Sequence, residues 1–247
     1  MEVSLVIRRR WSTALVWLAI LAATGCSGPK VTTKSSPELF RYPLRTLALV
    51  PFTTLTTPQV QDFGNPFFAT PQSVRRSDIS VAIPANVEGD LKQTVTVPDY
   101  AAEKVTQLFW SRLKLRAGLL VLSPSESARV SSSSADPSKT TQEAIGAAIA
   151  TRLKADAALV GQVLVFQERV GSRLGANPPA SVGFEVKVVA SDGSVVWIGN
   201  YYERQRPMTE DMIGFLQRWG AFVTAEELAQ YGVDEVLKEF PFGSPGK

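Results

Sequence analysis

Short, continuous runs of apolar residues mark the beginning and the middle of the chain. Residues 46–52 read Thr-Leu-Ala-Leu-Val-Pro-Phe, and residues 119–124 read Leu-Leu-Val-Leu-Ser-Pro. A run of this length that closes near a proline is typical of a strand buried on both faces, because neither face keeps a polar side chain. We therefore predict two central strands that other elements cover on both sides.

Two further segments have the periodicity of helices. Residues 99–117 predict an amphipathic helix with Asp99 as its cap. Residues 140–154 predict a second helix, in which Thr140 and Glu143 have the spacing of a capping box. The apolar positions of the first helix are Ala102, Val105, Phe109 and Leu113. The second helix has a seam of mostly small residues that we expect to face a sheet: Ala144, Ala147, Ala148 and Leu153.

The second half of the chain predicts a β-meander. Residues 158–170 form one long strand, and residues 181–190 alternate apolar and charged side chains with the period of another. Asp192-Gly193 is a signal for a two-residue type I′ turn, which fixes the register of the hairpin. The predicted opposite pairs are Val188 with Trp197, Val186 with Gly199, and Phe184 with Tyr201.

The C-terminal segment predicts two more helices. Thr209 is the expected cap of a short helix. Thr224 and Glu227 form a capping box for a terminal helix, which we expect to break at Gly232 and to end before Pro241. The apolar residues of the short helix are Met212, Phe215, Leu216 and Trp219.

A long loop is expected over residues 53–98, which contain five prolines and no helical period. Loops of this length are uncommon in compact domains and are usually functional or mobile. Within it, residues 79–83 and 93–97 are expected to pair as a hairpin. An aromatic group in the loop has two interpretations, a contact for a protein partner or a set of side chains that folds back onto the core. It consists of Phe63, Phe67 and Phe68.

The N-terminus has the features of a lipoprotein export signal. Three arginines at residues 8–10 precede an apolar run over residues 11–23, and the single cysteine, Cys26, follows small residues. This pattern resembles the lipobox of bacterial lipoproteins, which implies cleavage before Cys26 and attachment of acyl chains, such as palmitate, to it. The alternatives are an ordinary secretory signal and an uncleaved N-terminal helix.

The predicted organisation follows from this cleavage site. Residues 1–25 are the signal peptide, residues 26–43 are a lipidated linker rich in polar residues, and residues 44–247 form a single domain. Ser27 stands where the resemblance places an aspartate in lipoproteins retained at the inner membrane. The expected location is therefore the outer membrane, with the domain lipid-anchored and facing the periplasm.

Composition narrows the classes of function. The chain contains no histidine, which is the commonest general base and metal ligand. Its net charge of +3 falls to +1 without residues 1–25, because that segment carries three arginines and one glutamate. The remaining chain has no basic run of the kind that binds nucleic acid, and no hydrolase or nucleotide-binding motif. We expect no cofactor, no metal and no nucleic-acid partner.

The order of the predicted elements resembles the TolB N-terminal-like fold of envelope lipoproteins, a group that includes CsgG and LpoB. The segments that carry the resemblance are residues 47–52, residues 118–122 and residues 156–161, which read Asp-Ala-Ala-Leu-Val-Gly. The resemblance implies an α/β (α+β) fold, in which helices pack on a mixed β-sheet with a C-terminal β-meander. It also implies a protein that binds partners and performs no chemistry.

The sequence therefore predicts a non-catalytic assembly or accessory subunit of a cell-envelope complex, with Trp219 as a further candidate partner contact. One alternative is a CsgG-like oligomeric secretion component, although charged residues interrupt any lipid-facing side of residues 158–202. A less favoured alternative is a periplasmic hydrolase that depends on paired carboxylates. Its candidates are Glu168, Glu185 and Glu203.

Overall fold

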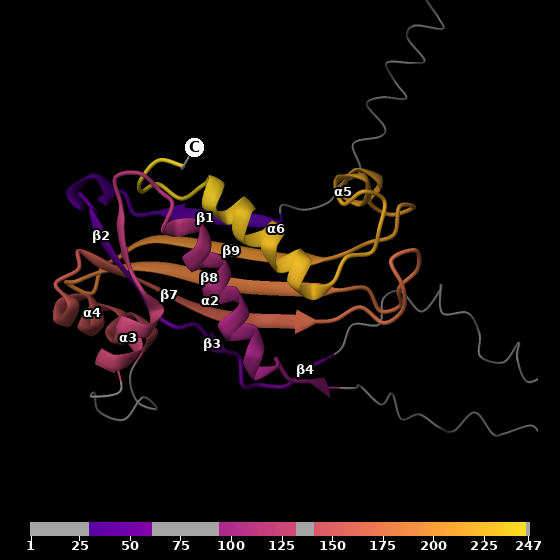
Figure 1. Cartoon of the computed structure of the whole chain (residues 1–247), viewed down its shortest axis with the longest axis horizontal. Coiled ribbons are helices and arrows are strands. Elements are labelled where there is room, and N and C mark those ends of the chain that lie inside the picture. The colour runs from indigo at the N-terminus through magenta and orange to yellow at the C-terminus, as the bar shows by residue number, and fades with distance from the viewer. Residues whose placement is uncertain (1–29, 61–93, 132–140, 246–247) are drawn as a thin grey trace, which may run out of the picture.

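The computed structural model describes residues 30–60, 94–131 and 141–245. Seven strands form one mixed sheet in the order β1-β9-β8-β7-β2-β6, and β3 pairs with β7 beside this path (Figure 1). β2 is parallel to β6 and to β7, whereas the pairs β7–β8, β8–β9 and β9–β1 are antiparallel. The predicted fold class is confirmed. The strands are β1 (Val31–Ser35), β2 (Thr46–Leu49), β3 (Thr53–Thr54), β6 (Leu120–Leu122), β7 (Ala157–Gln167), β8 (Ser181–Ala190) and β9 (Val195–Arg204).

Helices cover both faces of the sheet. α2 (Asp99–Leu113) and α6 (Ala225–Lys238) cross one face (Figure 1), and α4 (Gln142–Leu153), with α3 (Pro124–Ser131) beside it, packs on the other. Leu47 and Leu49 of β2 join the core under α2 and α6, while Ala48 joins the core under α4. The run at residues 46–52 is thus buried on both faces, as its composition predicts.

The capping residues of α2 and α4 each lie one position away from the predicted ones. Pro98 precedes the first turn of α2, and Asp99 lies within that turn without capping it. The Thr141 hydroxyl accepts a hydrogen bond from the backbone N–H of Ala144 at 3.3 Å, so Thr141 caps α4 in place of Thr140. The predicted seam is right in part, because Ala147 and Leu153 pack against the core, whereas Ala144 and Ala148 are exposed. The buried residues of α4 are Gly146, Ile149 and Ala150.

The β8–β9 hairpin has the predicted register but not the predicted turn. Gly193 donates its N–H to the carbonyl oxygen of Ala190, and Ala190 donates to Ser194, both at 2.9 Å. The loop therefore has three residues, 191–193, of which only Gly193 has a positive φ, +90°. The pairs that match the prediction are Val188 with Trp197, Val186 with Gly199, and Phe184 with Tyr201.

The segment predicted as a linker belongs in part to the domain. Val31–Ser35 form β1, which pairs along the outer edge of β9, and a short 3-10 helix follows at Leu39–Arg41. Four of the five β1 residues are exposed. An edge strand with little burial needs no alternating apolar side chains. The polar composition of β1 therefore suggests a linker when the sequence is read alone.

The long excursion after β2 is closed at its base. β4 (Gln59–Val60) pairs with β5 (Thr94–Val95) in a two-stranded antiparallel sheet. The strand expected near residue 95 is present as β5 and pairs with β4. The other half of the expected hairpin, residues 79–83, lies outside the described residues. Phe63, Phe67 and Phe68 lie outside them as well.

The C-terminal helices differ from the prediction in two places. α5 (Met212–Gln217) is capped by Asp211, whose carboxylate accepts a hydrogen bond from the N–H of Gly214 at 2.8 Å, and not by Thr209. α6 begins with the predicted capping box of Thr224 and Glu227 but continues through Gly232 without a break. Within the described part of the chain, none of the helices has the length and apolar character that crossing a membrane requires.

Candidate functional site

The short helix α5 turns an apolar surface to solvent at one end of the sheet (Figure 1). We call this surface the α5 patch. It consists of Met208, Met212, Ile213, Leu216 and Trp219, with exposed fractions that rise from 52% for Met208 to 91% for Trp219. Met212 and Leu216 lie four positions apart on α5 and so share one side of the helix, while Met208 and Trp219 lie just before and just after it. A group of exposed apolar residues in one short segment indicates an interaction site more strongly than a single exposed leucine does.

The opposite side of α5 is held against the domain. Gly214 is buried, and the ring of Phe215 packs edge-on against Phe222 with centroids 5.5 Å apart. The helix ends at Gln217, and Trp219 and Gly220 in the turn that follows have positive φ values of +58° and +64°. This left-handed turn sends the chain back toward α6 and leaves the Trp219 side chain in solvent.

A cluster of four charged side chains lies beneath α5. Arg218 forms an ion pair with Glu203 of β9, and both side chains are nearly fully buried. Lys30 Nζ lies 3.2 Å from Glu203 Oε1 and 3.4 Å from Asp211 Oδ2. The two positive and two negative charges balance, and burial of a charge without such a partner is costly. We call these four residues the charge cluster.

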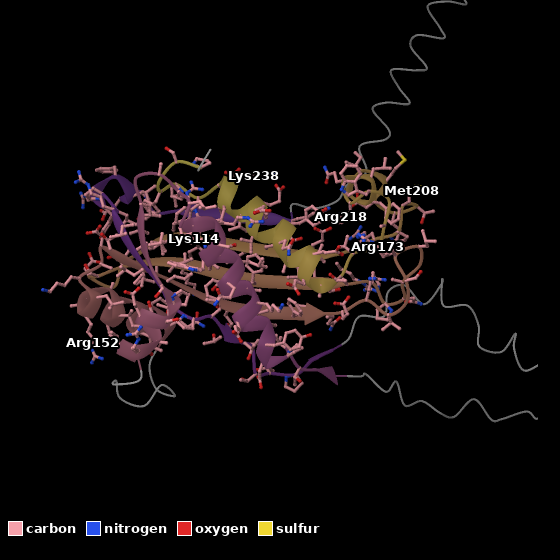
Figure 2. All side chains as sticks on the ribbon, viewed as in Figure 1. Lys114, Arg152, Arg173, Met208, Arg218 and Lys238 are labelled. Atoms are coloured by element: carbon pink, nitrogen blue, oxygen red, sulfur yellow. The ribbon has the colours of Figure 1, made fainter. Side chains whose placement is uncertain are left out.

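The charge cluster ties together three parts of the chain. Arg218 Nη1 donates to the carbonyl oxygen of Gly214 at 2.6 Å, which holds the end of α5. The Tyr201 hydroxyl donates a hydrogen bond to Glu203 Oε2 at 2.7 Å. Lys30 is the residue just before β1. Figure 2 labels Arg218 and Met208, which lie at the α5 end of the molecule. The position of α5 is therefore fixed by side chains from the residue before β1, from β9 and from the two residues that flank α5.

The pKa values in this region follow from burial and from the neighbouring charges. Burial and the charge of Glu203 raise the pKa of Tyr201 well above its ordinary range, so its hydroxyl stays a neutral donor. For Asp211, burial alone would raise the pKa. The hydrogen bond from the Gly214 N–H and the charge of Lys30 outweigh it, and the pKa of Asp211 is lowered.

The three carboxylates considered for hydrolysis have separate structural partners. Glu203 belongs to the charge cluster, Glu185 pairs with Lys187 at 2.9 Å, and Glu168 accepts the N–H of Ala225 at the start of α6 at 3.1 Å. The three carboxylates therefore have different partners, namely the charge cluster, a lysine and a backbone N–H, and these contacts pair none of the three with another. The described residues also contain no group of three or more Cys, Asp or Glu side chains that could hold a metal ion.

One open hollow lies between α2 and α3, with a volume of about 340 Å³. Phe52 and Ala102 form part of its floor, and Asp99 and Glu103 are the ionisable residues in its lining. The charge cluster does not border it. The hollow is therefore separate from the charge cluster.

The sequence identifies only part of this site. Trp219 is a predicted contact residue and is the most exposed member of the α5 patch, whereas Cys26 and the three loop phenylalanines lie outside the described residues. Sequence reasoning missed the charge cluster altogether, because Lys30 and Glu203 are far apart in the chain. The available signal for the patch is the spacing of Met208, Met212 and Leu216 at intervals of four.

Comparisons with known proteins find likeness in structure but not in sequence. No family model and no curated protein sequence matches the chain. The PelC dodecamer from Paraburkholderia phytofirmans is similar with 13% identity and a TM-score of 0.41, over 84% of this chain and 93% of that chain. The LpoB C-terminal domain from Salmonella enterica has 11% identity and a TM-score of 0.34, over 65% and 83%. Lipoprotein GNA1162 from Neisseria meningitidis has 12% identity and a TM-score of 0.32, over 70% and 91%. LpoB, which the sequence resemblance names, is thus among the similar structures, but identities and TM-scores at this level do not assign the chain to a family.

Proposed function

We propose that the protein is a lipoprotein anchored through Cys26 to the periplasmic side of the outer membrane. The observation that carries this proposal is the N-terminal sequence, in which three arginines and an apolar run precede Cys26. This order is typical of an export signal. β1 starts at Val31, so cleavage before Cys26 removes none of the described fold.

The domain serves, in this proposal, as a non-catalytic accessory subunit of a cell-envelope complex. The partners of Glu168, Glu185 and Glu203 support this role, because each carboxylate stabilises the fold. The pairing of β8 with β7 and β9 supports it as well. The apolar residues of β8 are buried under α2 and α6, which favours a role in the core over a role in a lipid-facing hairpin.

The partner contact is proposed for the excursion between β4 and β5. These two short strands pair Val60 with Thr94, so the two ends of the segment between them lie side by side. Long connections between elements often carry function. Phe63, Phe67 and Phe68 are then the apolar anchors, since a few aromatic residues usually dominate an interface.

Two experiments test this function. Wild-type protein is expected in the membrane fraction, labelled by a fatty-acid analogue, while Cys26→Ser is expected to be soluble or to accumulate as an unlabelled precursor. Identical fractionation together with an unlabelled wild type contradicts the anchor.

Affinity capture of the lipidated protein from native membranes, followed by mass spectrometry, is expected to recover a partner. The triple variant Phe63→Ser, Phe67→Ser, Phe68→Ser is expected to lose this partner, while its melting temperature stays unchanged. Unfolding of the triple variant would instead show that these phenylalanines belong to the core.

A further inference from the structure

We infer that the α5 patch is a second membrane contact, which lies in the interfacial layer of the same leaflet that holds the lipid on Cys26. The inference rests on the anchor proposed above. It assigns the exposed Trp219 to a lipid surface and not to a protein partner.

The reach of the chain places the patch close to the anchor. Lys30 follows Cys26 by four residues, which span at most about 14 Å when fully extended. Lys30 Nζ lies 3.4 Å from Asp211 Oδ2, and Asp211 is the cap of α5. The residue that begins α5 is therefore in contact with a residue that cannot move far from the membrane. The lipid surface is the nearest large apolar phase to the patch.

The chemistry of the patch suits the boundary between headgroups and acyl chains. Short helices that lie in this layer present tryptophan, leucine and similar residues on one side, and tryptophan is enriched there because its ring is apolar and its N–H is polar. α5 has six residues and is about 9 Å long. It is far too short to span a bilayer, so it is suited to rest along the surface.

The support of the patch is rigid. The charge cluster fixes α5 to β1 and β9 through Arg218, Glu203 and Lys30, and the Phe215 ring packs on Phe222. A helix held in this way presents its apolar side without further ordering, so little conformational entropy is lost on binding. The lipid anchor and the α5 patch are thus two linked contacts, and the second gains from the high effective concentration that the first provides.

Fluorescence quenching by brominated lipids tests the inference. The full chain is produced in its lipidated form and reconstituted in vesicles of phosphatidylethanolamine and phosphatidylglycerol, with and without bromine on the acyl chains. Cleavage before Cys26 leaves three tryptophans, at residues 110, 197 and 219. The Trp219→Phe variant gives the background of the other two. We expect the emission that Trp219 contributes to be lost in brominated vesicles and retained in unbrominated ones.

Two further variants separate the patch from general surface hydrophobicity. Met212→Ser with Leu216→Ser is expected to restore the Trp219 emission in brominated vesicles. Leu115→Ser is the matched control, because Leu115 is 63% exposed and lies two residues beyond the C-terminal end of α2, and it should leave quenching unchanged. Melting temperatures equal to that of wild type confirm that each variant is folded.

The outcomes distinguish the patch from the anchor. An acylated protein whose Trp219 is not quenched overturns the patch and leaves the anchor in place. If the wild-type protein carries no acyl chain, the anchor is overturned. If Trp219 of that protein is still quenched, the patch is supported. Trp219 that is unquenched in vesicles but photo-crosslinks to a protein in native membranes shows that the patch binds protein, which overturns the inference.

Discussion

The ring of Tyr201 on β9 occupies the space in which a side chain at Gly232 of α6 would lie. Tyr201 is buried, and its hydroxyl donates to Glu203 in the charge cluster. The close approach of α6 to the sheet is therefore coupled, through one tyrosine, to the support of α5. Gly232 is a packing residue within a continuous helix, and this corrects the expectation that it breaks the helix.

Replacing Gly232 with alanine tests this packing. In an exposed helix the change stabilises a protein by roughly 0.5–1 kcal/mol, because glycine is the poorer helix former. Here the new methyl group overlaps the Tyr201 ring, so we expect a loss of about 1–3 kcal/mol in the free energy of unfolding, as in other overpacked cores. Urea denaturation measures the difference.

A second variant shows whether the tyrosine ring is the cause. In Tyr201→Leu the smaller side chain leaves room for the methyl group, so adding Gly232→Ala to this background should cost less than it does in wild type. The double-mutant cycle compares the change in the free energy of unfolding caused by Gly232→Ala in the two backgrounds. The loss should be smaller in the Tyr201→Leu background, by more than the error of the measurement. A Gly232→Ala protein at least as stable as wild type would rule out the steric explanation.

Gly193 provides a test of backbone strain without a packing change. Its φ is +90°, and a Cβ at this position would meet no atom within 4 Å. We expect Gly193→Val to lower the free energy of unfolding by about 1–3 kcal/mol, because a β-branched residue is forced to positive φ. Gly193→Asn should cost less, since asparagine tolerates this region better. Equal melting temperatures for the valine variant and wild type would contradict the turn geometry.

The same hairpin shows why the sequence predicts a register better than a turn. A two-residue turn at Asp192-Gly193 and the observed three-residue loop differ by one position, and a bulge between Val188 and Val189 removes that difference. The apolar side chains of Val186 and Phe184 must face the core in either case, and a one-residue slip would expose them. Burial therefore determines the register, while the turn adapts to it.

Less of the candidate site than of the fold could be predicted from the sequence. Strong local patterns, such as the capping box at Thr224, are properties of a few neighbouring residues and are confirmed. The charge cluster joins Lys30 to Glu203 and Asp211 across the chain, and no local pattern encodes that contact. The polar strand β1 could not be predicted for a related reason. It is a strand because its backbone pairs with β9, and its own sequence lacks the apolar pattern of a strand.

Arg218 should be important for stability because its partner is buried. Arg218→Met leaves the Glu203 carboxylate without its main partner, and removal of one member of a buried pair costs about 3–5 kcal/mol. We expect the lower end of this range, since Lys30 Nζ remains 3.2 Å from Glu203 Oε1. Adding Glu203→Gln should recover part of the loss. Urea denaturation in which Arg218→Met unfolds at the wild-type midpoint would contradict a structural role for the pair.

Asp211 makes the stability of the α5 region depend on pH in a defined direction. Its pKa in the folded protein lies below its ordinary value of 3.8, so the folded state favours the charged carboxylate. This contribution is complete above pH 3.8 and is lost as the pH falls through the lower, folded pKa.

Asp211→Asn keeps a good capping side chain but removes the charge that pairs with Lys30. Above pH 5 the variant should be less stable than wild type by roughly 0.2–1 kcal/mol, as for other partly exposed ion pairs. As the pH falls below 3.8, the urea midpoints of the two proteins should converge, because protonation removes the same charge from wild type. A difference that stays constant from pH 6 to the acid limit would show that Asp211 acts through capping alone, and that its charge and the contact with Lys30 do not stabilise α5.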